Sequence, residues 1–203
     1  FVTNPLGRLE TRVLELSTRG DFRGGDQFTV QYLRDFEYLA RPFQVADGVI
    51  SSAGGYTFQE VQTSFNAGPQ RRIAGRVGMT RGQFFDGDRT EVSYSGRLEA
   101  TASLMFEPAV SVNWVDLPAG SFRNTVARTR ATFTLSPRSF VGALVQYASA
   151  SQTVSANVRF RWEYQPGSDL FVVFSEGRDT SPRGLPGLQN RGVVVKFTRL
   201  FRF

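Results

Sequence analysis

The sequence predicts an all-β fold, an antiparallel up-and-down transmembrane β-barrel with about 10–12 strands in this chain. Three observations predict it: apolar and polar residues alternate with a period of two, the alternating segments are long, and short connections alternate with longer ones. Membrane strands need about 9–11 residues, whereas strands of soluble proteins usually have about 5–6. The alternating segments fall in the longer range, and no segment of useful length shows a helical period.

The alternation is clearest from Val92 to Phe106 and from Val154 to Tyr164. In each stretch one face of the expected strand is apolar and the other carries mostly hydroxyl, amide or charged side chains. The same pattern divides the chain into about eleven expected strands, at 7–18, 26–38, 55–66, 70–82, 90–106, 109–116, 122–135, 139–149, 153–165, 169–178 and 190–203.

Proline marks the connections that we expect to be tight, because it presets a turn and donates no backbone hydrogen bond. They are Ala67-Gly68-Pro69, Glu107-Pro108, Ser136-Pro137-Arg138 and Gln165-Pro166-Gly167-Ser168. Longer connections are expected at 40–54, 82–89, 116–121 and 178–189. The connection at 149–152 is the one exception, because it is short at a place where the alternation of short and long connections predicts a long one. Bacterial single-chain barrels have even strand numbers. An odd count therefore fits the C-terminal part of a larger barrel, and one strand more or fewer would make residues 1–203 a single β-barrel domain.

Composition excludes several classes of function. The chain has no histidine and no cysteine, so a Ser-His-Asp triad, a Cys-His pair and the usual zinc sites are absent. We therefore expect that the protein is not an enzyme and that it binds no metal ion and no cofactor. The two carboxylates in Phe-Phe-Asp-Gly-Asp-Arg89 are predicted to belong to a turn. The net charge of +6 comes from arginines dispersed singly along the chain. That dispersion argues against a nucleic-acid partner.

If the apolar faces meet lipid, the polar faces line a lumen. The expected lumen-facing residues are Arg72, Arg76, Arg97, Glu99, Arg128, Arg130, Arg159, Arg161, Glu163 and Lys196. Basic residues outnumber acidic ones in this set, so an open lumen would favour anions, and a saccharide or an anionic solute is the expected ligand. The alternative is that these arginines form structural ladders with carboxylates and hydroxyls inside a filled barrel.

Aromatic residues gather near the tight turns and the C-terminus, as an interfacial girdle requires. The expected membrane-interface aromatics are Phe106, Phe133, Phe140, Trp162, Tyr164 and Phe201. One residue breaks the pattern: Arg34 falls on the apolar face of Phe28, Val30 and Tyr32.

The last thirteen residues, Arg191-Gly-Val-Val-Val-Lys-Phe-Thr-Arg-Leu-Phe-Arg-Phe203, end on phenylalanine with alternating aromatics before it. This stretch resembles the C-terminal signal of Gram-negative outer-membrane proteins, with Phe197, Phe201 and Phe203 as the signal residues. The stretch Asn157 to Asp179 is similar to the end of an uncharacterised barrel domain that follows a family-9-like carbohydrate-binding module in outer-membrane proteins. The resemblance implies a bacterial outer-membrane location, with outer-membrane lipid and the barrel-assembly machinery as partners. Together with the basic polar faces, this location predicts a membrane anchor and solute channel for a larger protein with a carbohydrate-binding-like module.

Two alternatives remain open. A soluble all-β carbohydrate-binding module would pack the same apolar faces inward. The C-terminal part of a TonB-dependent transporter would also end on an aromatic strand, and a plug domain encoded upstream would identify it.

Overall fold

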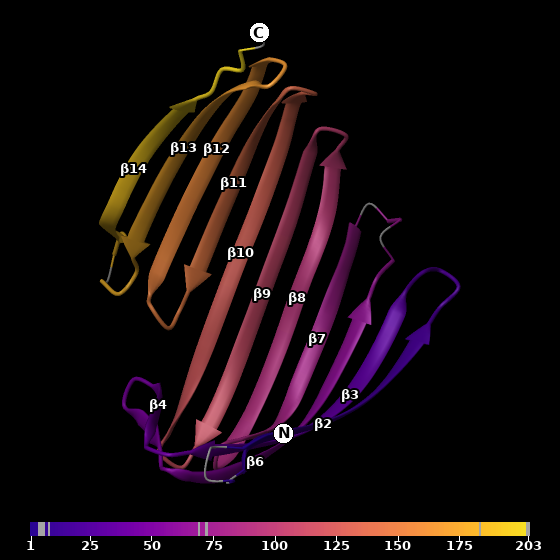
Figure 1. The fold of residues 1–203 in the computed structure, drawn as a ribbon, viewed down its shortest axis with the longest axis vertical. Helices are drawn as coiled ribbons and strands as arrows, with labels where there is room; N and C mark the ends of the chain where they lie inside the picture. The colour runs from indigo at the N-terminus through magenta and orange to yellow at the C-terminus, as the bar shows by residue number, and fades with distance from the viewer. Residues whose placement is uncertain (4–6, 8, 69, 72, 183, 202–203) are drawn as a thin grey trace. The chain divides into compact units, whose positions relative to one another are not determined.

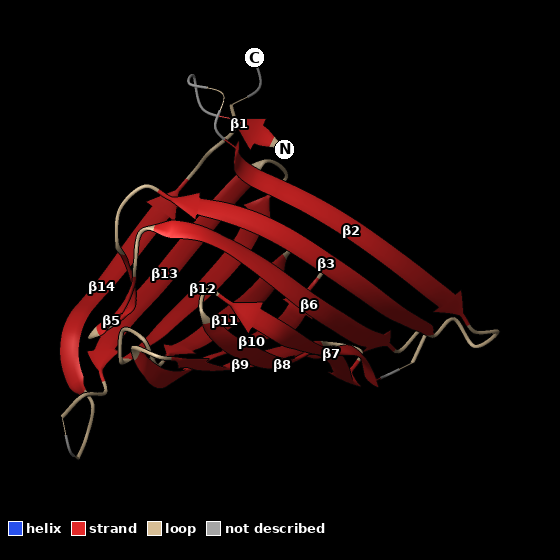
Figure 2. Ribbon diagram, turned by 90° about the horizontal axis from the view of Figure 1, so that it is seen from below, coloured by secondary structure: helices blue, strands red, loops and turns tan. Residues whose placement is uncertain are grey.

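A computed structural model describes residues 1–3, 7, 9–68, 70–71, 73–182 and 184–201, and every regular element among them is a β-strand (Figures 1 and 2). One antiparallel sheet of 12 strands has the order β1-β2-β3-β6-β7-β8-β9-β10-β11-β12-β13-β14. Each strand therefore pairs with the next strand of the sheet along the chain, and the predicted all-β, up-and-down arrangement is confirmed. No helix in the described ranges is long and apolar enough to cross a membrane.

The strands are mostly longer than those of soluble proteins. Their bounds are β1 Val2–Thr3, β2 Leu9–Asp21, β3 Gln27–Leu39, β4 Phe43–Ala46, β5 Val49–Ser51, β6 Gly54–Asn66, β7 Ile73–Phe84, β8 Gly87–Thr101, β9 Leu104–Leu117, β10 Gly120–Ser136, β11 Ser139–Ala148, β12 Thr153–Gln165, β13 Ser168–Asp179 and β14 Gly187–Phe197. The expected strands correspond to β2, β3 and β6–β14. The sequence pattern did not predict β1 or the separate β4–β5 hairpin.

Four expected connections are wrong in place or length. The connection expected to be tight at Ala67-Gly68-Pro69 is longer, since β6 ends at Asn66 and β7 begins at Ile73. The β8–β9 turn lies at Ala102-Ser103, where the Ser103 N–H donates to Thr101 Oγ1 at 3.2 Å, and Pro108 lies inside β9. Alternation continues through this two-residue turn, which leaves little trace in the sequence. The expected long connections at 82–89 and 116–121 are also two-residue turns, since β7 ends at Phe84 and β8 begins at Gly87, and β9 ends at Leu117 and β10 begins at Gly120.

The chain divides into two compact units. Unit 1 comprises Phe1–Tyr94 and Ser111–Asn124, and unit 2 comprises Ser95–Val110 and Thr125–Phe203. Strands β8, β9 and β10 contribute residues to both units.

In unit 1, strand pairing assigns every side chain of β2, β3, β6 and β7 to one of two faces. Leu16 pairs with Tyr32, Tyr32 with Val61, and Val61 with Arg81. Because side chains alternate along a strand, residues that share these rows share a face. This apolar face carries Leu14, Leu16, Phe28, Val30, Tyr32, Val61, Phe65, Val77 and Met79. The opposite, polar face carries Gln31, Glu60, Gln62, Ser64, Arg76 and Thr80.

The core of unit 1 forms where the β4–β5 hairpin folds onto one end of the polar face. Val49 of β5 is buried together with Val115 and Leu117 of β9. Phe84 and Phe122 pack against this cluster. The hairpin therefore covers the end of the polar face rather than the apolar face.

In unit 2, β10–β14 lie side by side (Figure 1). Pairing of Phe133 with Val141, Val141 with Phe160, and Phe160 with Val172 defines the apolar face. Many of its large side chains are exposed, including Val145 at 48% and Trp162 at 46%. No layer of the described chain covers this face, so its apolar side chains are available to a partner.

The C-terminal segment is fixed to the β12–β13 turn. Thr198 and Asp169 exchange two backbone hydrogen bonds, at 2.8 and 3.1 Å, and the Leu200 N–H donates to Ser168 Oγ at 3.0 Å. Gly167 in this turn has a φ of 77°, and an added Cβ would lie 2.6 Å from a methyl carbon of Leu200. Glycine is thus required at this position. The last strand nevertheless ends at Phe197, short of the expected end at 203.

Candidate functional site

The candidate site is the polar face of unit 2, where arginines from β10 and β12 share one side of the sheet. Arg128 pairs with Gln146 and Arg130 with Leu144. In turn Gln146 pairs with Ser155, Leu144 with Asn157, and Gly142 with Arg159. The rows place the predicted residues Arg128, Arg130, Arg159 and Arg161 on a single face. This juxtaposition follows from the register, which the sequence pattern alone does not give.

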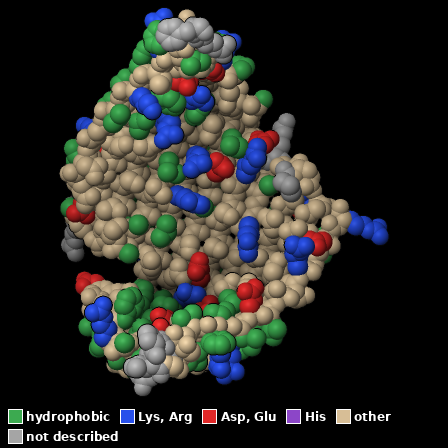
Figure 3. Space-filling view, in the orientation of Figure 1, with side chains coloured by type: hydrophobic (Ala, Val, Ile, Leu, Met, Phe, Trp, Pro, Cys, Tyr) green, Lys and Arg blue, Asp and Glu red, His purple; other side chains and the backbone are tan. Residues whose placement is uncertain are grey.

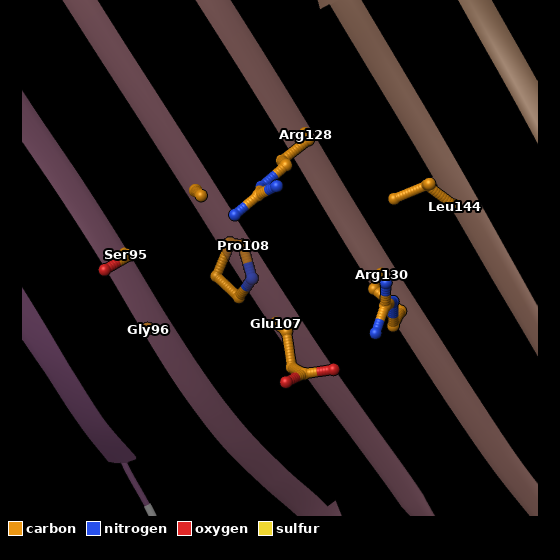
Figure 4. A pocket seen from close by; sticks show the side chains of 8 residues that line it. Ser95, Gly96, Glu107, Pro108, Arg128, Arg130 and Leu144 are labelled. Atoms are coloured by element: carbon orange, nitrogen blue, oxygen red, sulfur yellow. The ribbon is translucent and has the colours of Figure 1, made fainter.

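Two cavities lie on this face, and Arg130 and Leu144 line both. The first, of about 220 Å³, is also lined by Ser95, Gly96, Glu107, Pro108, Ala109 and Arg128. Figure 4 shows the side chains of Arg128 and Arg130 reaching out from β10, with Glu107 and Pro108 on the neighbouring β9. The second, of about 320 Å³, is also lined by Thr132, Phe140, Gly142, Ala143, Asn157 and Arg159. Polar groups and guanidinium groups therefore converge on space large enough for a small solute.

Glycine at position 142 opens the second cavity. Gly142 lies between Thr132 and Arg159 in its row. An added Cβ there would meet no atom within 4 Å. Because β11 presents no side chain at this point, Arg130 and Arg159 flank an open space above the sheet.

Ion pairs neutralise only part of the positive charge. Arg161 donates to both carboxylate oxygens of Asp169, at 3.0 and 3.3 Å, and Arg97 pairs with Glu99 at 2.6 Å. Within the described residues, Arg128, Arg130, Arg159 and Lys196 make no ion pair. The space-filling view shows Lys and Arg side chains spread over the region of β10–β14, with fewer acidic ones among them (Figure 3). The unpaired arginines give this face a surplus of positive charge that suits an anion.

The polar face of unit 1 is chemically different, because it carries acidic as well as basic residues and includes a half-buried ion pair. Arg89 and Glu60 form an ion pair at 2.6 Å, with the Glu60 side chain only 11% exposed. Arg76 donates to Ser64 Oγ at 3.0 Å, and Ser111 donates to Glu91 at 2.9 Å. A cavity of about 260 Å³ adjoins these groups, lined by Thr29, Gln31, Gln62, Thr63, Ser64, Arg76, Gly78, Met79, Thr80, Arg89, Glu91 and Ser93.

Sequence reasoning missed Arg89, because it lay in the expected connection at 82–89. In the structure it lies in β8 and reaches Glu60 across Gly82 of β7, whose position offers no room for a side chain. Its guanidinium carbon also lies 5.3 Å from the centre of the Phe84 ring. The sequence signal for this ion pair is a glycine, Gly82, on the strand between one that carries an acidic residue and one that carries a basic residue.

The remaining predicted lumen-facing residues lie on the polar faces of both units. Arg76 lies on the polar face of unit 1, whereas Glu163 and Lys196 lie on the polar face of unit 2. Glu163 accepts a hydrogen bond from the Gly167 N–H at 3.0 Å. Arg72 lies outside the described residues, as does Phe203 of the expected C-terminal signal.

The structure corrects one of the predicted interface aromatics. Phe140 pairs with Arg161 and lines the cavity of Arg130 and Arg159, so it lies on the polar face. The strand begins at Ser139, directly after the turn, and the alternation there is too short to fix which face each residue takes. Phe133 and Trp162 lie on the apolar face, and Phe106 alternates with Glu107, which lines the cavity.

Aromatic side chains cluster where β12 and β14 approach the C-terminal segment. Tyr164 stacks on Phe197 with ring centres 5.1 Å apart, and Trp162 lies 6.1 Å from Tyr164. Phe201 follows β14 outside any strand and lies under Arg199 at 5.1 Å. The aromatic cluster near the C-terminus therefore combines residues of β12, of β14 and of the segment after β14.

No protein-family model matches the chain, and no curated protein matches it. A solved structure of the NanC porin is similar at 11% sequence identity and a TM-score of 0.38, over 94% of this chain and 94% of that chain. A likeness this weak transfers no function.

Proposed function

We propose that the chain forms a membrane-spanning β-barrel of the bacterial outer membrane, or the C-terminal part of one, whose polar face lines a channel for anionic solutes. The observation that carries the proposal is the contrast between the faces of unit 2. One is apolar and uncovered in the described chain, and the other carries Arg128, Arg130 and Arg159 without ion pairs. A binding and transport role follows from this contrast, and no reaction is proposed.

The extent of the apolar face supports a membrane location. On β12 its residues run from Val154 to Trp162, close to the ~9–11 residues of a membrane strand, whereas on β13 the uncharged part runs from Leu170 to Phe174. Beyond Phe174 on β13 the face becomes charged, since Glu176 bonds to both Arg178 and Arg191. At the opposite end lie the rings of Trp162 and Tyr164. An apolar band between a charged end and an aromatic end is typical of strands that cross lipid.

The polar face supports anion preference. Fixed guanidinium groups raise the local concentration of anions and lower that of cations in a narrow aqueous path. Glu107 is the one acidic side chain that lines the two described cavities, and it makes no ion pair among the described residues. The arginines therefore outnumber the carboxylates where a solute would pass.

The test is ion selectivity of the full-length protein in a planar bilayer under a KCl gradient. We expect the wild type to prefer chloride, and R128Q/R130Q to lower the anion-to-cation permeability ratio by about twofold or more. The matched control is R34Q/R81Q, which removes the same charge from the apolar face and should leave selectivity unchanged. Cation preference in the wild type, or equal selectivity in R128Q/R130Q and the wild type, would refute an anion channel.

The resemblance at 157–179 supports a finer proposal, in which this barrel anchors a larger protein carrying a carbohydrate-binding-like module. Assembly would then depend on the barrel-assembly machinery recognising Phe197, Phe201 and Phe203. The full-length gene tests both points. An upstream module of that kind supports the anchor, whereas an upstream plug domain would indicate a TonB-dependent transporter.

A further inference from the structure

Arg34, the residue that breaks the apolar pattern, has a counterpart on the same face of unit 1. Arg34 pairs with Leu14 on one side and with Gln59 on the other. Arg81 pairs with Val61, which lies two residues from Gln59 on β6. Arg34 and Arg81 therefore flank β6 on the apolar face, one row apart.

These arginines lie where the apolar face ends. From their rows to the strand ends at Asp21, Gln27, Asn66 and Ile73, the apolar face of β2, β3, β6 and β7 carries no charged residue. In that direction the face consists of Leu16, Thr18, Gly20, Phe28, Val30, Tyr32, Val61, Thr63, Phe65, Ile73, Gly75, Val77 and Met79. In the other direction, Arg12 follows on β2 beside Phe36. The two arginines thus mark a border between an apolar surface and a polar one.

The side chains at this border offer hydrogen-bond donors, and no acidic side chain of β2, β3, β6 or β7 lies beside them to accept. Arg34 and Arg81 are both exposed, and neither makes an ion pair within the described residues. The Tyr32 hydroxyl donates to Gln59 Oε1 at 3.1 Å, which leaves the amide nitrogen of Gln59 as a third donor at β6. On this face of β2, β3, β6 and β7 the one acidic residue is Glu10, beyond Arg12 on β2. A cluster of donors with surplus positive charge fits an anion.

We propose that Arg34 and Arg81, with the Gln59 amide, bind the anionic phosphate of a membrane lipid headgroup. The proposal rests on the proposed function, because it requires the apolar face to meet lipid. A lipid supplies both parts that the surface offers: acyl chains cover the uncharged rows, and the phosphate meets the guanidinium groups at their border. Arginine near the interface is tolerated on a lipid-facing strand, and its planar fork fits phosphate oxygens.

The test is retention of lipid by the detergent-solubilised full chain, measured by native mass spectrometry after mixing with phosphatidylglycerol or phosphatidylcholine. We expect the wild type to retain phosphatidylglycerol in preference to phosphatidylcholine, and R34Q/R81Q to lose about fivefold or more of that preference. R34K/R81K should keep part of it, because the charge remains while the fork is lost. R128Q/R130Q, with the same charge change on the polar face, should retain as much as the wild type.

Equal retention by R34Q/R81Q and the wild type would overturn the headgroup site. Insertion of each variant into phosphatidylcholine vesicles separates this result from failure of the proposed function. If the wild type inserts but retains no phosphatidylglycerol, only the headgroup site is wrong. If the wild type does not insert into these vesicles, the membrane barrel is wrong and the headgroup site fails with it.

Discussion

Replacing Arg89 by alanine is expected to lower the free energy of unfolding by about 2–4 kcal/mol. The substitution leaves the Glu60 carboxylate, whose side chain is 11% exposed, without the guanidinium that lies 2.6 Å away. It also removes the contact of Arg89 with the Phe84 ring. An uncompensated buried charge costs far more than the pair contributes, because the charge has lost its hydration. Urea unfolding of the refolded protein, followed by circular dichroism, measures the change.

Two variants decide whether the buried charge is the cause. Arg97→Ala breaks a pair with Glu99 in which both side chains are at least half exposed, and should cost about 0–1 kcal/mol. E60Q/R89A removes the charge as well as its partner, so it should be more stable than Arg89→Ala alone. If Arg89→Ala unfolds at the same urea concentration as Arg97→Ala, the Glu60 carboxylate does not depend on Arg89 to offset its burial.

Val49→Asp is expected to release the β4–β5 hairpin from the polar face. Val49 is 6% exposed and packs with Val115 and Leu117, so a carboxylate there would be buried without a partner at a cost of about 3 kcal/mol or more. Lifting the hairpin away from the cluster avoids most of that cost. Hydrogen exchange at the amides of β4 and β5 should therefore become much faster, with little change in β11–β13.

The neighbouring residue supplies the control. Ile50 lies in the same short strand but is 55% exposed, so Ile50→Asp introduces the same charge where water can reach it. We expect hydrogen exchange in this variant to resemble that of the wild type. Equal loss of protection in both variants would mean that burial of Val49 does not hold the hairpin in place.

Alternation predicted the long strands well because each has one apolar and one polar face over many residues. The run from Val154 to Tyr164 coincides almost entirely with β12. The same signal could not reveal the β4–β5 hairpin, since its strands have four and three residues. It also could not place the turn at Ala102-Ser103, because the alternation passes through that turn unchanged.

The arginine-rich face was predictable in part. Arg128, Arg130 and Arg159 lie in strands whose alternation is regular, so a common side could be expected. Which of them lack a partner depends on register, because Arg161 meets Asp169 only through the pairing of β12 with β13. Arg34 appeared in the sequence as an exception to a pattern. Its meaning becomes clear only when β6 places it beside Gln59 and near Arg81.

The apolar face is expected to meet lipid, and Trp162 reports on this contact directly. The chain has two tryptophans, so Trp114→Phe leaves Trp162 as the single indole, 46% exposed on the apolar face. We predict that lipids brominated on their acyl chains quench its fluorescence in reconstituted vesicles, and that iodide in the water quenches it much less. Quenching by iodide together with no effect of brominated lipid would show that this face does not contact the membrane.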